Sequence, residues 1–180
     1  MMSRIVVLVG SNRKGGNTDL LAKAFADGAR EHHEVELISV TDYKVGPCLG
    51  CNSCFQKEGH PCFQQDDMQL IYDKLKEADI LVVASPVYFY GLSAQLKAVI
   101  DRLHNPIRDT FKIRKLAMLL VGAATLPELF DAILAQYKLV LNFFKLEDGG
   151  TVLVRGAKEK GDVRQGNSLQ QAFQLGKTIS

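Results

Sequence analysis

All four cysteines of this 180-residue chain lie close together, in the pattern C-x2-C-x2-C-x7-C formed by Cys48, Cys51, Cys54 and Cys62. Four soft thiolates at this spacing can reach one site, so the pattern predicts a capacity to bind metal. Zinc takes the same ligands, although structural zinc sites more often use two separated C-x2-C pairs. A redox-sensing thiol pair and a metal-free loop with cysteines packed as small apolar side chains are the other interpretations.

A second candidate site is the segment Gly10-Ser11-Asn12-Arg13-Lys14-Gly15-Gly16-Asn17-Thr18, which joins an apolar strand to a helix. Successive backbone N–H groups at the start of a helix form an anion site, to which polar and cationic side chains can add. The candidate ligands for a phosphate are Ser11, Arg13, Lys14, Gly16, Asn17 and Thr18. The alternative interpretation is a tight turn with a helix cap.

This segment departs from two common nucleotide-binding patterns. A dinucleotide fold requires G-x-G-x-x-G and an acidic residue after the second strand, where this chain has Ser39 and Thr41. A nucleotide triphosphatase requires Gly-Lys-Thr, where this chain has Gly16-Asn17-Thr18. The segment therefore favours a phosphomonoester such as that of FMN.

A third candidate is the run Ser85-Pro86-Val87-Tyr88-Phe89-Tyr90-Gly91, which follows another apolar strand. A planar conjugated ring requires apolar surfaces and nearby backbone polar groups, and this run offers both. We expect Pro86, Val87, Tyr88, Phe89, Tyr90 and Gly91 to border such a ring, with Tyr88 and Tyr90 as candidate hydrogen-bond donors. A hydrophobic staple for the next helix is the alternative.

The elements that must position these residues alternate along the chain. Continuous apolar runs predict strands at residues 4–10, 34–39, 80–84, 116–121 and 151–154, and helical spacing predicts helices at residues 18–29, 68–78, 93–103, 127–144 and 169–177. Residues 41–65 show no period and predict a long functional loop. The alternation predicts an α/β fold with a doubly wound five-stranded parallel sheet, order 2-1-3-4-5, in a single domain over residues 1–180.

Composition limits the function classes. The net charge of +2 is too small, and the basic residues too scattered, to predict a nucleic-acid partner. The apolar run at residues 5–9 is too short for a signal peptide or a membrane span, so we expect a cytoplasmic protein without a membrane partner. The helix at residues 127–144 has more apolar surface than one sheet face can cover, which predicts a homo-oligomer, either a dimer or a tetramer.

Taken together, the segments at residues 10–18, 47–54, 66–67, 85–88 and 149–162 resemble the NADPH-dependent FMN reductase and iron–sulfur flavoprotein branch of the flavodoxin-like superfamily. The resemblance implies that Ser11, Arg13, Asn17 and Thr18 bind the FMN phosphate and that residues 86–91 border the isoalloxazine. It also implies a third flavin loop at Gly122, Ala123 and Ala124, and a 4Fe–4S ligand set in the four cysteines.

The resemblance implies an FMN-dependent oxidoreductase that takes electrons from NAD(P)H and reduces quinones, flavin or a similar acceptor. Its chemistry is centred on the flavin, so no acid–base side chain is required. One alternative is an iron–sulfur flavoprotein that passes single electrons between a 4Fe–4S cluster and FMN to a redox protein. Another is a non-catalytic flavin-binding or redox-sensing module, since fold alone does not fix function.

Overall fold

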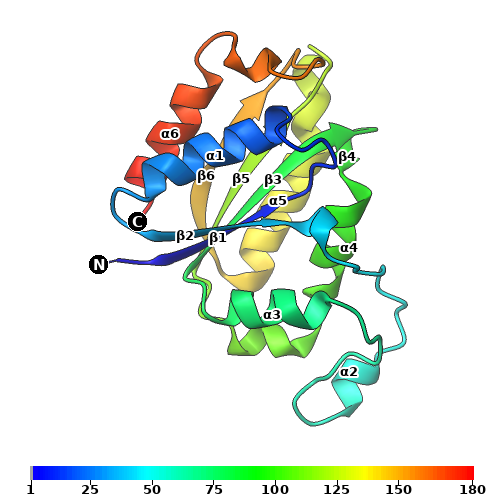
Figure 1. The fold of residues 1–180 in the computed structure, drawn as a ribbon. Helices are drawn as coiled ribbons and strands as arrows, with labels where there is room; N and C mark the ends of the chain where they lie inside the picture. The colour runs from blue at the N-terminus through cyan, green and yellow to red at the C-terminus, as the bar shows by residue number, and fades with distance from the viewer. Residues whose placement is uncertain (1) are drawn as a thin grey trace.

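The computed structural model describes residues 2–180 and is built around one parallel sheet (Figure 1). Its strands are β1 (Arg4–Val9), β2 (Glu34–Ser39), β3 (Ile80–Tyr88), β5 (Lys115–Val121) and β6 (Glu147–Val154), with a short β4 (Gly91–Leu92). The five long strands follow the order β2-β1-β3-β5-β6, all parallel, while β4 pairs antiparallel with the end of β3. This confirms the predicted flavodoxin-like fold and the reversal of winding between the first and third long strands.

Helices cover both faces of the sheet (Figure 1). One layer holds α1 (Asn17–Ala29) and α6 (Ser168–Thr178), and the other holds α3 (Met68–Lys76), α4 (Ala94–Arg102) and α5 (Asp131–Phe144). A single turn, α2 (Ser53–Gln56), lies within the predicted long loop. Between residues 2 and 180, no helix has both the length and the apolar character needed to cross a bilayer.

The central strands are buried on both faces, which explains their continuous apolar sequence. Ile5, Val7 and Val9 of β1 pack under α1 and α6, whereas Val6 and Leu8 join the core beneath the other layer. The two helices of the first layer touch where Gly28 faces the backbone of Phe173, and only glycine allows this approach because a Cβ would lie 2.0 Å from the carbonyl oxygen. This contact fixes the end of the chain against α1.

Two strands differ from their predicted lengths. The strand predicted at residues 80–84 continues to Tyr88, because Ser85 and Pro86 still pair with β5. Pro86 is tolerated there since the pairing of β3 with β1 ends at Ala84, which leaves β3 without a long neighbour on that side. The strand predicted at residues 151–154 begins at Glu147, and a register irregularity lets it carry Gly149 and Gly150 beside β5. The sequence did not predict this start, because the glycine and acidic residues at positions 147–150 do not favour a strand.

The long helix differs in its surroundings. Residues 127–130 form a 3-10 turn before α5, and within α5 only Ile133 and Tyr137 are fully buried. Leu139 and Phe143 are exposed, at 69% and 63% of their surface. The apolar excess noted in the sequence is therefore surface in the single chain.

Candidate functional site

A cavity of about 290 Å³ lies at the carboxyl ends of β1, β3 and β5, where the winding of the sheet reverses. It unites residues from four separate segments: Ser11, Arg13, Asn17, Thr18, Pro86, Val87, Tyr88, Val121, Ala123, Ala157 and Lys158. The structure thus brings together most of the residues that we predicted for the phosphate and the ring. The protein has other cavities, but this one lies at the edge where parallel α/β sheets bind ligands.

The segment at residues 10–18, here called the phosphate loop, is shaped by its own hydrogen bonds. The Ser11 hydroxyl oxygen accepts from the Arg13 N–H at 3.2 Å, and Ser11 and Thr18 are both buried. Gly16 caps α1 without any side-chain cap, which leaves the first N–H groups of the helix available to an anion. Gly10 allows α4 to approach, because a Cβ there would lie 2.6 Å from the Ser93 hydroxyl oxygen.

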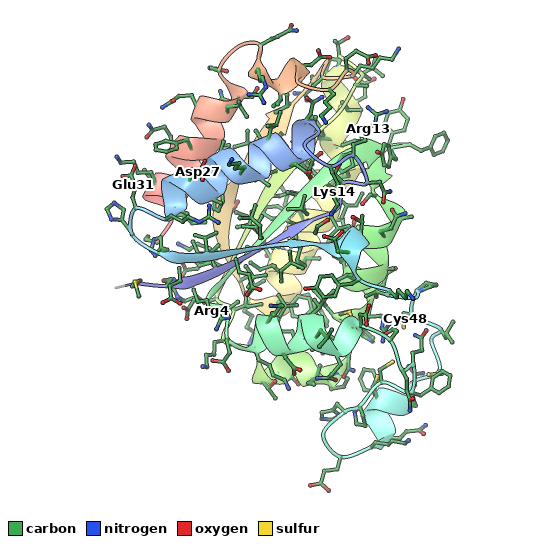
Figure 2. All side chains as sticks on the ribbon, in the orientation of Figure 1. Arg4, Arg13, Lys14, Asp27, Glu31 and Cys48 are labelled. Carbon is green, nitrogen blue, oxygen red and sulfur yellow. The ribbon has the colours of Figure 1, made fainter. Side chains whose placement is uncertain are left out.

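Lys14 lies apart from this cavity. Its ammonium donates to the hydroxyl oxygen of Ser39, the last residue of β2, at 2.8 Å. It also forms an ion pair with Asp42, which follows β2. It is not among the lining residues, so the structure gives it a position that ties the phosphate loop to the neighbouring strand. In Figure 2, Lys14 and Arg13 project from the same loop at the start of α1.

Asn17 uses its whole side-chain amide within the protein. The amide nitrogen donates to the carbonyl oxygens of Ala157 and Glu159, at 3.3 and 2.8 Å. The amide oxygen accepts from the N–H groups of Gly161 and Val163, at 2.8 and 3.3 Å. An asparagine side chain has two donor hydrogens and two acceptor lone pairs, so these four bonds occupy all of them.

The aromatic run forms a tight hairpin. Tyr88 pairs with Gly91, and the two-residue loop between them, Phe89 and Tyr90, has φ values of 48° and 62°. This is the pattern of a type I′ turn, which glycine and asparagine normally fill. Tyr88 lines the cavity, whereas Phe89 is 99% exposed and, like Tyr90 and Gly91, lies outside the lining.

The third predicted flavin loop contributes Ala123 to the cavity, while Gly122 lies against the buried side chain of Leu129 and Ala124 lies outside the lining. Three lining residues escaped the sequence prediction: Val121, Ala157 and Lys158. Ala157 and Lys158 could have been predicted from the basic segment after the last strand, because the carboxyl end of that strand lies at the same edge of the sheet as the phosphate loop.

Residues 44–67, here called the cysteine loop, project beside α3 and α4, and Figure 2 shows Cys48 well apart from Arg13 and Lys14. Cys48 and Cys51 are exposed and Cys54 and Cys62 are half-buried, which rules out core packing as the role of the first two. Hydrogen bonding from Ser53 lowers the pKa of Cys51, and burial raises the pKa of Cys54.

The donor set of this loop fits a metal in chemistry but not in its present arrangement. Across residues 2–180, no three His, Cys, Asp or Glu side chains are grouped closely enough to hold a metal ion. All four thiols are free, however, and all lie on one loop. A four-thiolate site would therefore require the loop to close around its metal. Such a change is common, because many metal sites form only when the metal binds.

The base of the cysteine loop is fixed by a buried ion pair. Arg102, at the end of α4 and 3% exposed, donates to the Asp66 carboxylate and to the Gly46 carbonyl oxygen, the latter at 3.3 Å. Asp66 also accepts from the N–H groups of Gly46 and Met68. Burial opposes the charge of Asp66, but the Arg102 guanidinium and these N–H groups outweigh it and lower the pKa of Asp66.

The parallel sheet, its strand order and the cavity at its switch point define a flavodoxin-like α/β protein with a candidate anion site at the start of α1. The chain belongs to the NADPH-dependent FMN reductase family, whose model matches residues 3–152. Membership makes it an FMN-dependent oxidoreductase that uses a reduced nicotinamide, as the family resemblance of the sequence implied.

Similar proteins agree with this assignment. An iron–sulfur flavoprotein of Methanocaldococcus jannaschii is 35% identical over 190 residues, covering 98% of this chain and 95% of its own. The fold matches an NAD(P)H:quinone oxidoreductase from Methanothermobacter marburgensis with a TM-score of 0.76 at 15% identity, covering 98% of this chain and 96% of the other. It also matches an azoreductase of Bacillus anthracis with a TM-score of 0.75 at 17% identity, covering 99% and 100%. At these identities the two structural matches show the fold alone.

Proposed function

We propose that the cavity binds FMN with its phosphate at the phosphate loop and its isoalloxazine along residues 86–88, and that the protein reduces a small-molecule acceptor with NAD(P)H. The carrying observation is that one cavity joins the start of α1 to the apolar end of β3. When bound, FMN supplies the redox chemistry, accepting two electrons from the nicotinamide and passing them on.

The side chains of this chain bind and orient rather than transfer protons. Arg13 and the N–H groups at the start of α1 offset the phosphate charge, with Ser11 and Thr18 as neutral partners. Pro86, Val87 and Tyr88 offer apolar surface to a planar ring and exclude water from one side of it. We propose Tyr88 and Tyr90, both half-exposed, as the groups nearest an incoming acceptor.

Quenching of flavin fluorescence tests the binding half of this proposal. Purified protein titrated with FMN should quench its fluorescence with one binding site per chain, and the loaded protein should oxidise NADPH or NADH in the presence of a quinone. Protein that leaves FMN fluorescence unchanged would contradict the proposed site. An azo dye serves as a second acceptor, because the fold neighbours include an azoreductase.

As a second candidate function, we propose that the cysteine loop binds a 4Fe–4S cluster and exchanges electrons with the flavin. Support comes from four free thiols on one anchored loop and from the name of the relative in Methanocaldococcus jannaschii. Anaerobically prepared protein should then contain about four iron and four sulfide per chain. A Cys51→Ser/Cys54→Ser variant serves as the control. If the anaerobic protein contains no iron and still reduces quinones at an undiminished rate, the cluster proposal is contradicted and the reductase without a cluster stands. Stoichiometric zinc would instead indicate a structural zinc site.

We further propose a single domain over residues 1–180, a homo-oligomer and a cytoplasmic location. One shared sheet supports the single domain, and the exposed Leu139 and Phe143 of α5 support the homo-oligomer. Four unpaired cysteines are typical of a reducing compartment and support the cytoplasmic location. Sedimentation at micromolar concentration tests assembly, since a monomer at that concentration would contradict it. Leu139→Glu should lower the assembled fraction if α5 forms the contact.

A further inference from the structure

The segment after β6, residues 157–163, is here called the C-terminal loop, and it lies outside the matched family region of residues 3–152. We propose that Lys158 of this loop is a second cation of the phosphate site, and that Asn17 is a positioning residue that holds it there. This inference rests on the proposed binding of FMN and assigns a ligand that neither the family match nor the sequence patterns supply.

The fold brings the C-terminal loop to the phosphate loop. Because α6 packs on α1 through Gly28 and Gly176, the chain leaving β6 must cross the start of α1 before it enters α6. In Figure 1 the segment before α6 lies at the top of the molecule, next to the beginning of α1. The crossing places Ala157 and Lys158 in the lining of the cavity that holds Ser11 and Thr18.

Hydrogen bonds then fix the position of this loop. All four bonds of the Asn17 amide go to its backbone, between Ala157 and Val163. The Arg13 guanidinium adds a bond to the Lys158 carbonyl oxygen at 3.2 Å. The Asp162 carboxylate accepts from the N–H groups of Lys158 and Glu159, at 3.0 and 2.7 Å. Asn17 therefore has no donor left for a phosphate and acts on the site through the loop.

Charge singles out Lys158 among the lysines near the phosphate loop. Lys14 is paired with Asp42, and Lys160 donates to the Lys14 carbonyl oxygen. For the chain from residue 2 onward, the ion pairs include neither Arg13 nor Lys158, which are the two cations in the cavity lining. A phosphomonoester carries a charge of about −1.5 to −2 near neutral pH, which two uncompensated cations match.

This pairing predicts how the site distinguishes flavins. Riboflavin lacks the phosphate, so it gains nothing from Lys158, whereas FMN gains a charge-assisted contact. Lys158→Gln should weaken FMN about tenfold, equivalent to about 1.4 kcal/mol, and leave riboflavin unchanged. The difference in FMN affinity between the unmodified protein and Lys158→Gln should shrink at high salt, because screening weakens the lysine–phosphate contact in the unmodified protein. Lys23→Gln, which removes an exposed lysine of α1 and changes the net charge equally, is the matched control.

Asn17→Leu tests positioning against direct ligation without adding a charge to the cavity. The substitution keeps the approximate shape but removes the donors to the carbonyl oxygens of Ala157 and Glu159 and the acceptor of the opposite N–H groups, so the C-terminal loop should loosen. Alone, it should weaken FMN severalfold more than riboflavin. In a Lys158→Gln background it should add little to that ratio, because both changes then remove the same contact. An Asn17→Leu effect on the FMN-to-riboflavin ratio that persists undiminished would mean that Asn17 itself contacts the phosphate.

The measurement is the FMN and riboflavin affinity of each full-length variant by fluorescence quenching, with thermal unfolding as a check that each one folds. Unmodified protein that binds FMN, together with Lys158→Gln protein that binds it equally well, would overturn this inference alone. Equal losses for FMN and riboflavin would also overturn it. Unmodified protein that binds neither flavin would overturn the proposed function as well.

Discussion

The phosphate end of the cavity and the cysteine loop differ in how far the protein assembles each site by itself. Around the cavity, hydrogen bonds from Asn17 and Arg13 join two distant segments, and the cations already face a common space. In the cysteine loop, the Asp66–Arg102 pair fixes the base and Asn105 donates to the His60 carbonyl oxygen, but two of the four thiols lie in solvent. Neutral N–H groups and separate cations can be held in place without a ligand, whereas four converging thiolates repel one another until a metal offsets their charge.

The largest expected effect comes from breaking the anchor of the cysteine loop. Asp66→Ala leaves the buried Arg102 guanidinium without its carboxylate, which should lower the free energy of unfolding by about 3 kcal/mol. Denaturant unfolding measures this change. Asp67→Ala is the control, since this neighbouring carboxylate accepts one N–H bond from Lys44 and should cost only about 1 kcal/mol. Equal losses for both variants would mean that the ion pair does not secure the loop.

The same anchor predicts a pH dependence. Because the pKa of Asp66 is lowered in the folded protein, its ionisation stabilises the fold fully above the unfolded pKa of about 3.9. That contribution is lost as the pH falls through the folded pKa, below this value. The stability difference between the unmodified protein and Asp66→Asn should therefore be constant near neutrality and shrink below about pH 4. A difference that does not shrink at all between pH 4 and pH 2 would contradict the assignment.

The next largest effect tests the assembled site. Arg13→Ala removes one of the two cations of the cavity and its bond to the C-terminal loop, and it should weaken FMN about 10- to 100-fold. Riboflavin should lose much less, because it carries no phosphate. Flavin fluorescence titration measures both affinities. Losses of the same size for the two flavins would place Arg13 away from the phosphate.

The hairpin should give a smaller effect of opposite sign. Phe89→Asn/Tyr90→Gly supplies residues that favour positive φ, and it should raise the free energy of unfolding by about 1 kcal/mol. If the aromatic side chains serve the acceptor, the rate of quinone reduction should fall while stability rises. Phe89→Ala keeps the unfavourable turn and should gain no stability. A stabilised double variant with full activity would show that Tyr90 has no part in the reaction.

The smallest expected effect concerns the thiols themselves. In metal-free protein, Cys48→Ser/Cys51→Ser should change the free energy of unfolding by less than about 0.5 kcal/mol, because both side chains are exposed. FMN affinity should also stay the same. Chemical denaturation under reducing conditions checks the first point. A loss of 2 kcal/mol or more would mean that the loop is packed before metal binds, and the contrast between the two regions would fail.

Much of the fold could be predicted because buried parallel strands show as uninterrupted apolar runs. Residues 4–9 and 115–121 form strands close to their predicted bounds, and their alternation with helices gave the strand order. The start of β6 could not be predicted, since Gly149 and Gly150 do not favour a strand and are held there by β5. The α2 turn was also missed, because a single helical turn has no sequence period.

The sequence alone determined the local chemistry of this protein: the candidate anion site at the start of α1, the apolar run at the end of β3 and the four thiols of one loop. These depend on residue type and on short spacing, which no later packing alters. Only the tertiary structure decided which groups act together. Asn17, a predicted phosphate ligand, bonds to the C-terminal loop, Lys14 lies beside Asp42, and Lys158 is part of the cavity lining. The bonds of Asn17 to the C-terminal loop join residues more than a hundred positions apart, and they depend on how α6 packs on α1.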